Sequence, residues 1–331
     1  MPVTAKDLAR ELNLSQPTVS RILSGDSNHR AAQATRERVL EAARRLGYQP
    51  NALASSLRRG RTGIIGLHTS YDYDVRNDFL GAIVGSLQRA CSGHDLDVLL
   101  HSARSGVSAH TMFGKLRDGR VDGLILHAEC EDPLVPMLEQ SGLPVVTVAD
   151  PLPGLAAVTS DDAGGMALLI EHLWGRGYRQ FAFVTPERAP ASVERRRHAF
   201  EAQLVLRGVT GSRARVHAVD YEKVEPLLPE LVRSGAGTPL AVCCWNDRTA
   251  ANLLRECTAR GVSVPGTLAV AGFDGLLDRA LMAQQLVTVA CPWARVAETA
   301  LDLLRQRIDA DADVEPTEVC LPVHLIGGDT A

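Results

Sequence analysis

Residues 14–25 read LSQPTVSRILSG, and this short stretch decides the fold of the N-terminal segment. Ser15 is a good N-cap for a helix that begins at Gln16. Pro17 fits the first turn, where backbone N–H groups have no intrahelical partner. Residues 24–25, Ser-Gly, end the helix. The apolar residues expected to form its buried face follow helical spacing: Val19, Ile22 and Leu23.

Two further helices are predicted around this one. Thr4 caps an earlier helix, with Asp7 near the place of a capping-box partner, and Asn13 ends it in a tight turn. A third helix is expected to begin at Thr35 and to end near Gly47. A helix, a short turn, a second helix and a supporting third make a helix-turn-helix head, with the quoted stretch as its recognition helix.

The side chains of the recognition helix favour DNA as the partner. Gln16 suits adenine edges, Arg21 suits guanine, and Pro17 can touch only apolar surface such as a thymine methyl group. Hydroxyl groups and first-turn N–H groups are expected to contact phosphates. With Thr4, the remaining residues predicted to bind DNA in the head are Ser15, Thr18 and Ser20. Three core helices of a larger domain are the alternative, but they leave the surplus arginines unexplained.

Charge is distributed unevenly along the 331 residues. Residues 1–61 hold 11 Lys and Arg against 5 Asp and Glu, whereas the rest of the chain holds 24 against 34. This asymmetry indicates a polyanion-binding head on an acidic body. The seven cysteines show no C-x-x-C pair, no apolar run is long enough to span a bilayer, and the N-terminus lacks a signal-peptide pattern. We therefore expect a cytoplasmic protein without membrane contact.

Apolar, β-rich runs alternate with helical segments from residue 63 onward. The predicted strands of a first series are 63–69, 95–102, 122–128 and 143–149, and those of a second are 180–186, 213–219, 239–245, 267–273 and 285–290. The predicted helices are 78–92, 108–118, 132–141, 162–176, 192–207, 222–234, 247–260, 274–281 and 293–308. Such alternation predicts two parallel, doubly wound sheets in tandem.

An enzyme is the rival interpretation of this α/β body. Asp247 and Asp274 stand where catalytic carboxylates can lie in such folds. However, no G-x-G-x-x-G follows a strand, and neither a P-loop nor a G-x-S-x-G elbow occurs. The histidines and cysteines show no metal-ligand spacing. We predict a protein that is not an enzyme and that has no metal and no cofactor.

Four motifs carry a resemblance to a known family: VTAKDLA (3–9), LSQPTVSRILS (14–24), TRERV (35–39) and LGYQPNALASSL (46–57). They closely resemble the head of LacI/GalR-type transcription factors, and the resemblance extends over essentially the whole chain. It implies an all-α helix-turn-helix head and a periplasmic-binding-protein-like body of two lobes. The implied division is 1–48 for the head, 49–62 for a hinge, and 63–331 for the body, with lobe 1 at about 63–160 and 292–320 and lobe 2 at about 161–291 and 321–331.

The resemblance gives the hinge a role in DNA binding. In the family this segment folds when two protomers meet on DNA, and paired hinge helices enter the minor groove. By position Leu57 is the side chain that wedges into a base step, Ala54 faces the partner helix and Asn51 can cap. A flexible basic linker is the alternative.

The resemblance also places an effector between the lobes. SVERRRHAF puts Arg196 at the effector-binding arginine, and VAGFDG makes Asp274 the acceptor for ligand hydroxyls. CWNDRTA implies Asn246 and Arg248 as pocket residues. The other residues expected at the effector are Trp293 and Tyr221, as aromatic contacts, and Asp74, Arg76 and Arg104, from loops of the first lobe. Each of these residues has an alternative interpretation. The arginines of 195–197 can all lie on one solvated helix, Asn246 can serve as a helix cap, and Trp293 can belong to the core.

Three departures from the family pattern bear on this expectation. Ala149 stands where sugar binders carry an aspartate, with Asp150 one step late, and Ala199 replaces a glycine. Loop 24–34 is about two residues longer than usual. Because several arginines are expected at the crevice, we hypothesise an anionic effector such as a sugar phosphate or sugar acid. A neutral sugar is the alternative.

The functional prediction follows. We expect a transcriptional repressor, controlled allosterically by a small sugar-like effector, that acts as a homodimer on a near-palindromic operator. The dimer is expected because no leucine heptad follows the body. The alternatives are an activator or bifunctional regulator, and a ligand-binding signalling module with a degenerate head.

Overall fold

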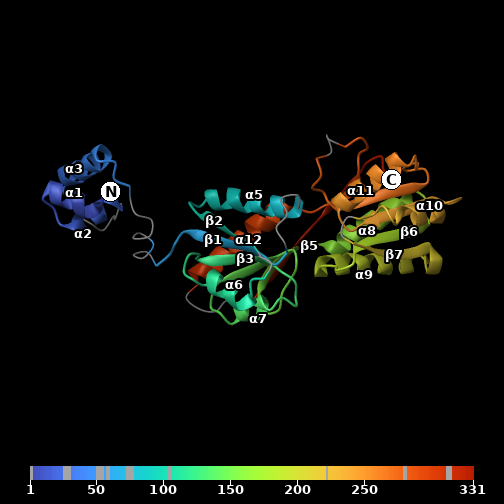
Figure 1. Ribbon diagram of the computed structural model, residues 1–331, viewed down its shortest axis with the longest axis horizontal. Helices are drawn as coiled ribbons and strands as arrows, with labels where there is room; N and C mark the ends of the chain where they lie inside the picture. Colours follow the sequence, from blue (N-terminus) through green and yellow to red (C-terminus); the bar gives the residue numbers. More distant parts are fainter. Residues whose placement is uncertain are drawn as a thin grey trace. The chain divides into compact units, whose positions relative to one another are not determined.

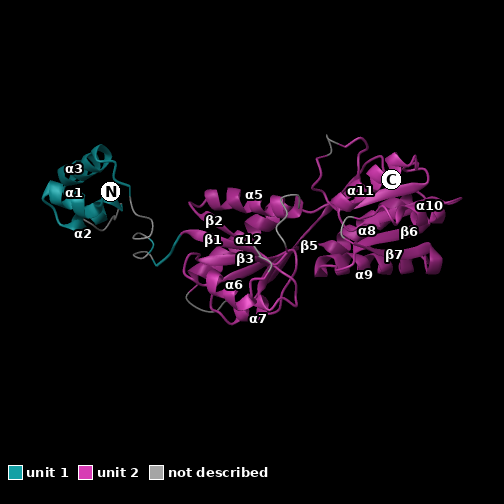
Figure 2. Cartoon of the chain, in the orientation of Figure 1, with its two compact units in different colours: residues 1–62 teal, residues 63–331 magenta. Residues whose placement is uncertain are grey.

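The computed structural model describes residues 3–24, 31–49, 56, 60–71, 78–102, 106–220, 223–278, 282–310 and 315–331. The chain divides into two compact units, residues 1–62 and 63–331 (Figure 2). Several predicted site residues lie outside the described residues: Asn51, Ala54 and Leu57 of the hinge, Asp74, Arg76, Arg104 and Tyr221 of the effector site, and most of loop 24–34.

The described part of unit 1 includes the helices α1 (Ala5–Leu12), α2 (Gln16–Leu23) and α3 (Gln33–Arg45) (Figure 1). The predicted capping box is present, because Thr4 Oγ1 accepts from the Asp7 N–H at 3.3 Å and Asp7 Oδ2 accepts from the Thr4 N–H at 3.0 Å. Asn13 ends α1 with a left-handed φ of 55°. These caps satisfy backbone groups that short helices leave without partners.

A small apolar core holds the three helices together. It is built around Leu8 of α1, Val19 and Ile22 of α2, and Val39 of α3. The start of α3 differs from the prediction by two residues, since its N-cap is Ala32, which offers no side-chain bond. The sequence signal at Thr35 was misleading because packing of α3 against α1 and α2 outweighs the missing cap.

Unit 2 contains two six-stranded sheets of matching strand order. The first has the order β11-β5-β4-β3-β1-β2, and the second has the order β12-β10-β9-β8-β6-β7. Pairing is parallel throughout except between β10 and β12. The strands of the first sheet are β1 (Ile64–Thr69), β2 (Asp97–Ser102), β3 (Gly123–His127), β4 (Val145–Val148), β5 (Ala156–Ser160) and β11 (Glu318–Leu321). Those of the second are β6 (Gln180–Pro186), β7 (Ala214–Val219), β8 (Leu240–Cys244), β9 (Leu268–Asp274), β10 (Val287–Ala290) and β12 (His324–Ile326).

Helices cover both faces of each sheet, as the doubly wound prediction requires (Figure 1). The first lobe carries α5 (Asp78–Ser92), α6 (Ala109–Leu116), α7 (Leu134–Glu139) and α12 (Trp293–Asp309). The second carries α8 (Asp162–Gly175), α9 (Ala191–Leu206), η1 (Gly211–Arg213), α10 (Leu228–Ser234) and α11 (Asp247–Ala259). No helix among these described segments is long and apolar enough to cross a membrane.

The predicted helix at 274–281 is wrong in the part that the structure describes. Strand β9 continues through Asp274, and no helix occurs over residues 275–278. The prediction also missed β5, β11 and β12. The chain therefore passes from one lobe to the other after β5, before α12, and between β11 and β12.

Candidate functional site

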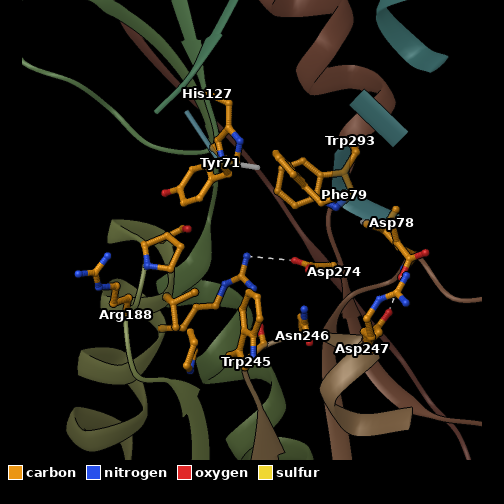
Figure 3. Close-up of a pocket in the computed structure, with 18 of the residues that line it drawn as sticks. Tyr71, Asp78, Phe79, His127, Arg188, Trp245, Asn246, Asp247, Asp274 and Trp293 are labelled. Carbon is orange, nitrogen blue, oxygen red and sulfur yellow. Dashed lines mark hydrogen bonds and ion pairs between the residues drawn. The ribbon is translucent and has the colours of Figure 1, made fainter. Parts of the chain in front are cut away.

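A cavity of about 560 Å³ lies between the two lobes of unit 2, at the carboxyl ends of their strands (Figure 3). This is where open α/β sheets bind ligands. The first lobe contributes Tyr71, Asp78, Phe79, His127, Glu129, Ala149 and Trp293, and the second contributes Pro186, Arg188, Pro190, Ser192, Val193, Arg196, Trp245, Asn246, Asp247, Arg248, Asp274 and Leu276.

Arg196 of α9 forms the floor of this cavity and is only 3% exposed. Its Nε donates to Asp162 Oδ1 at 2.8 Å, and its Nη1 donates to the Trp245 carbonyl at 2.7 Å. The guanidinium carbon lies 3.9 Å from the centroid of the Phe273 ring. Burial opposes the charge, but the carboxylates of Asp274 and Asp162 raise the pKa of Arg196 overall. The side chain is therefore held charged in one orientation.

Asp274 completes the floor as the last residue of β9. Its Oδ1 lies 3.1 Å from Nη2 of Arg196. Burial raises the pKa of Asp274 to about 7, and the nearby Arg196 limits the rise. The residue has a φ of 103°, which L-residues rarely adopt, and such backbone strain is concentrated at functional sites.

The start of α11 supplies the predicted residues Asn246 and Arg248, with Asp247 between them. Asn246 caps the helix, since its Oδ1 accepts from the Thr249 N–H at 2.8 Å. Asp247 accepts from the Leu276 N–H at 2.9 Å and from the Thr288 hydroxyl, while burial raises its pKa to about 6. Asp247 thus stabilises the loop after β9 as well as lining the cavity.

Arg248 connects the lobes. Its Nη2 lies 2.7 Å from Oδ2 of Asp78, at the start of α5 in the first lobe. Two of the arginines predicted to attract an anion, Arg196 and Arg248, are therefore paired with carboxylates. Arg188 is a lining arginine that the sequence analysis missed, and among the described residues it has no ion-pair partner.

Aromatic rings form the roof of the cavity (Figure 3). Trp293 and Phe79 meet edge to face with centroids 4.7 Å apart, and His127 lies 4.7 Å from Phe79 and 4.6 Å from Tyr71. Burial lowers the pKa of His127 to about 4, so the imidazole is neutral at pH 7. Tyr71, Phe79 and His127 were not predicted as site residues, although each stands near the carboxyl end of a first-lobe strand or at the start of the helix that follows.

The head carries a second candidate site on α2. Gln16, Pro17 and Arg21 are exposed, whereas Val19 and Ile22 on the same helix are buried. Ser15 caps the helix, with its Oγ accepting from the Thr18 N–H at 3.3 Å. The exposed face thus presents an amide, a guanidinium and first-turn N–H groups together, which suits a DNA groove.

The fold and both sites define a class of protein: a helix-turn-helix head joined to a two-lobed, ligand-binding body. Comparison with known families agrees, because residues 4–51 match the bacterial regulatory proteins of the lacI family and residues 170–331 match the periplasmic binding protein-like domain. The sucrose operon repressor of Pediococcus pentosaceus is 30% identical over 98% of each chain. The chain therefore belongs to the LacI family, and it is a DNA-binding transcriptional regulator rather than an enzyme.

Other relatives extend the comparison. The transcriptional regulator PtxS of Pseudomonas putida is 28% identical over 94% of this chain and 91% of the relative. The lac repressor dimer bound to operator and the anti-inducer ONPF has a TM-score of 0.84 at 24% identity, covering 100% of this chain and 99% of its own. The complex of the regulator CelR with cellobiose has a TM-score of 0.72 at 25% identity, covering 99% and 100%.

Proposed function

We propose that this regulator is a homodimeric repressor whose affinity for a near-palindromic operator is controlled by a small polyhydroxy ligand in the interlobe cavity. The observation that carries the proposal is the buried Arg196–Asp274 pair beneath the Trp293–Phe79 roof. A charged hydrogen-bonding floor and an aromatic cover suit the polar edge and the apolar face of a sugar ring. The domain division of the sequence analysis, with its hinge at 49–62, is part of this proposal.

The charges of the described lining favour a neutral ligand over the anionic one first hypothesised. Arg196 and Arg248 each face a carboxylate. The described lining includes three arginines against four acidic residues, which are Asp78, Glu129, Asp247 and Asp274. Because carboxyl groups already lie beside Arg196 and Arg248, an anionic ligand would have to compete with them for these two arginines.

Control of DNA binding requires that the ligand bind one arrangement of the lobes better than another. The Asp78–Arg248 pair joins the lobes at the cavity, so a ligand that contacts both lobes competes with or reinforces it. We propose that the ligand shifts the equilibrium between arrangements of the lobes and that this shift alters the hinge. Operator affinity then changes, with a coupling free energy of about 1–3 kcal/mol. Two similar structures support the proposed partners: the lac repressor dimer is bound to operator, and CelR is bound to cellobiose.

The first test is selection of bound DNA from a randomised pool by the full chain, repeated with Leu57→Ala. We expect a near-palindromic site with a kinkable central step, and weaker binding by the variant because the wedge is lost. Recovery of no sequence above background, with and without added sugars, would contradict the repressor proposal and favour a ligand-binding module.

The second test addresses the ligand by calorimetry with matched free and phosphorylated sugars. We expect the neutral member of a pair to bind more tightly. Tighter binding of the phosphate would restore the anionic hypothesis. Fluorescence anisotropy of the selected operator, with and without the sugar that binds, then measures the coupling.

A further inference from the structure

Positive charge gathers at the amino ends of the strands in the second sheet. Strands β7, β6, β8 and β9 are neighbours and pair in parallel, so the connections that lead into them reach the same edge of the sheet. These four connections are residues 176–179, 207–213, 235–239 and 260–267. They hold five arginines and no Asp or Glu. The interlobe cavity lies at the carboxyl ends of the strands, so this edge is a separate surface.

A sixth arginine joins these five from the last turn of α10. Helix α10 ends beside the start of β7, because its Ser234 accepts a hydrogen bond from Arg215 of that strand. Arg207 is half-buried, and the other five arginines are exposed. We call the six arginines the basic edge: Arg176, Arg179, Arg207, Arg213, Arg233 and Arg260.

The first lobe provides a comparison, since its sheet has a matching strand order. The connections that lead into β2, β3 and β4 are residues 93–96, 117–122 and 140–144. They hold two arginines against three aspartates. An arginine at the end of a helix stabilises the last carbonyl groups of that helix, and helices end at this edge in both lobes. That role therefore does not account for an excess of charge in the second lobe alone.

Most charges of the basic edge lack a carboxylate partner. Arg179 donates to the Trp174 carbonyl at 2.9 Å, and Arg213 donates to a backbone carbonyl of its own connection at 3.0 Å. Among the described residues, the one ion pair of the basic edge joins Arg260 to Glu256 at 3.6 Å. A carbonyl partner leaves the charge of an arginine in place, so the basic edge carries a net positive charge on an otherwise acidic body.

The other groups at this edge favour phosphate as the partner. Glycine, serine and threonine fill most of the remaining positions of the four connections. The structure describes all four connections, and none contains an exposed large apolar side chain. Val205 and Leu206, which are exposed, precede them on α9, and Asp329 lies at the β10 end of the edge, where its N–H donates to the Gln285 carbonyl. Arginine, hydroxyl and backbone N–H groups are the usual contacts of DNA phosphates, whereas protein interfaces commonly have an apolar core.

We propose that the basic edge binds the phosphate backbone of a DNA segment other than the one that the head reads. The chain belongs to a family of DNA-binding regulators, so DNA is a polyanion that this protein meets. A guanidinium group keeps its charge and can donate two parallel hydrogen bonds to a phosphate. Contacts of this kind are independent of base sequence and weaken steeply with salt. The regulator then joins two DNA segments, whichever ligand the cavity takes.

The test is whether the full-length protein joins two DNA duplexes. Short duplexes of unrelated sequence carry either a donor dye or an acceptor dye, and energy transfer reports their presence in one complex. We expect energy transfer with the wild type at low salt. Raising the salt concentration from about 50 to 200 mM should weaken the complex by more than about tenfold, because binding to phosphates releases counterions.

Three variants separate the basic edge from the heads, and circular dichroism checks that each variant folds. The test variant replaces three exposed arginines of the basic edge: Arg179→Gln, Arg213→Gln and Arg233→Gln. It should weaken the joining of duplexes by at least about tenfold. Lys in place of Gln at the same positions keeps the charge and should cost less than about threefold. The control variant replaces three exposed arginines of the first lobe, Arg117→Gln, Arg120→Gln and Arg295→Gln, and should have an effect of less than about twofold.

Four outcomes would overturn the proposal. Equal energy transfer with the test and control variants would mean that the heads alone join the duplexes. Absence of energy transfer with the wild type at every salt concentration would mean that no second duplex binds. An equal loss with Lys and with Gln would assign the arginines to the helix ends rather than to phosphates. If the test variant loses labelled polyglutamate but keeps the second duplex, the basic edge binds an acidic protein instead.

The proposed repressor function is tested separately. Selection of operator DNA depends on the heads, which the test variant leaves unchanged. The test variant should therefore recover the same operator as the wild type, so that failure of the basic edge to bind DNA leaves the repressor proposal intact.

Discussion

Nη2 of Arg196 lies 3.1 Å from Oδ1 of Asp274, and both side chains are buried beneath the interlobe cavity. On its other side the same guanidinium bonds Asp162, at the start of α8, at 2.8 Å. One arginine thus joins β9, α8 and α9 at the place where a ligand would bind. The Arg196–Asp274 pair therefore lines the ligand site and also stabilises the second lobe.

Replacing Arg196 should be costly. In Arg196→Met the carboxylates of Asp162 and Asp274 lose their common cation, and breaking a buried pair in this way costs about 3–5 kcal/mol. Urea unfolding should show this loss, and calorimetry should show loss of ligand binding. Arg197→Met is the matched control on α9. Arg197 forms ion pairs with the partly exposed Glu194 and Glu201, so its loss should change stability by about 1 kcal/mol or less. Equal stability of the two variants would contradict the structural role of Arg196.

Stability should depend on pH through Asp274. Its pKa is raised by burial to about 7, from 3.8 for an unperturbed side chain. Between these values the native state holds a proton that the unfolded state has released, so the free energy of unfolding falls as pH rises and levels off above pH 7. From pH 5 to pH 7.5 this contribution amounts to about 2–3 kcal/mol.

Asp274→Asn removes this contribution, whereas Asp247 and His127 still titrate, so the difference in unfolding free energy between wild type and variant should change by this amount from pH 5 to pH 7.5 in urea unfolding. The surface variant Asp302→Asn, on α12, should keep the dependence of the wild type. A difference between wild type and Asp274→Asn that stays constant with pH would show that Asp274 does not titrate in this range.

The head should lose sequence discrimination when its exposed polar side chains are removed. We expect Gln16→Ala and Arg21→Ala each to weaken binding to the selected operator by about 1–3 kcal/mol and to relax base preference at one position of each half-site. Arg10→Ala, an exposed position on α1 that pairs with Asp7, should have a smaller effect and leave base preference intact. Anisotropy at fixed salt concentration, with single-base operator variants, measures both properties. Unaltered preference in Arg21→Ala would exclude α2 as the helix that reads bases.

Two glycines of α8 offer a packing test. A Cβ at Gly165 would lie 2.7 Å from Cζ of Phe273 and 2.9 Å from Cγ1 of Val289, whereas a Cβ at Gly175 would meet no atom within 4 Å. Gly165→Ala should therefore destabilise the protein by about 1–3 kcal/mol. Gly175→Ala should be neutral or stabilising by up to about 1 kcal/mol, because Ala favours helix. Thermal unfolding of the two variants compares them, and a stable Gly165→Ala would show that α8 packs more loosely on β10 than the structure describes.

Local patterns predicted the elements with strong periodic signals. The capping residues Thr4 and Ser15 marked α1 and α2 correctly, and the apolar runs at β6 and β8 were found. The prediction of a helix at 274–281 failed, because β9 continues through Asp274 and pairs there with Ala290 of β10. Strand β5 was missed because its residues AAVTS carry little side-chain signal for a strand, and pairing with β4 and β11 determines it.

The pocket was only partly predictable for the same reason. Resemblance placed Arg196, Asn246, Arg248, Asp274 and Trp293 near a ligand, and all of them line the cavity. Nothing in the sequence indicated that Phe79 and His127 would form the roof with Trp293, since these residues come from three elements far apart along the chain.

The sequence by itself determined the three-helix head, the alternation of strands and helices, and the family to which the chain belongs, because those features rest on spacing and capping within a few residues. The tertiary structure alone decided which of three consecutive arginines is buried. Arg195 reaches the end of β4, Arg196 is enclosed against Asp162 and Asp274, and the half-buried Arg197 pairs with Glu194 and Glu201 of its own helix. It also decided that Ala149 of the first lobe and Asp274 of the second both line the cavity. The charge and polarity of a site depend on groups that only the packing of distant segments brings together.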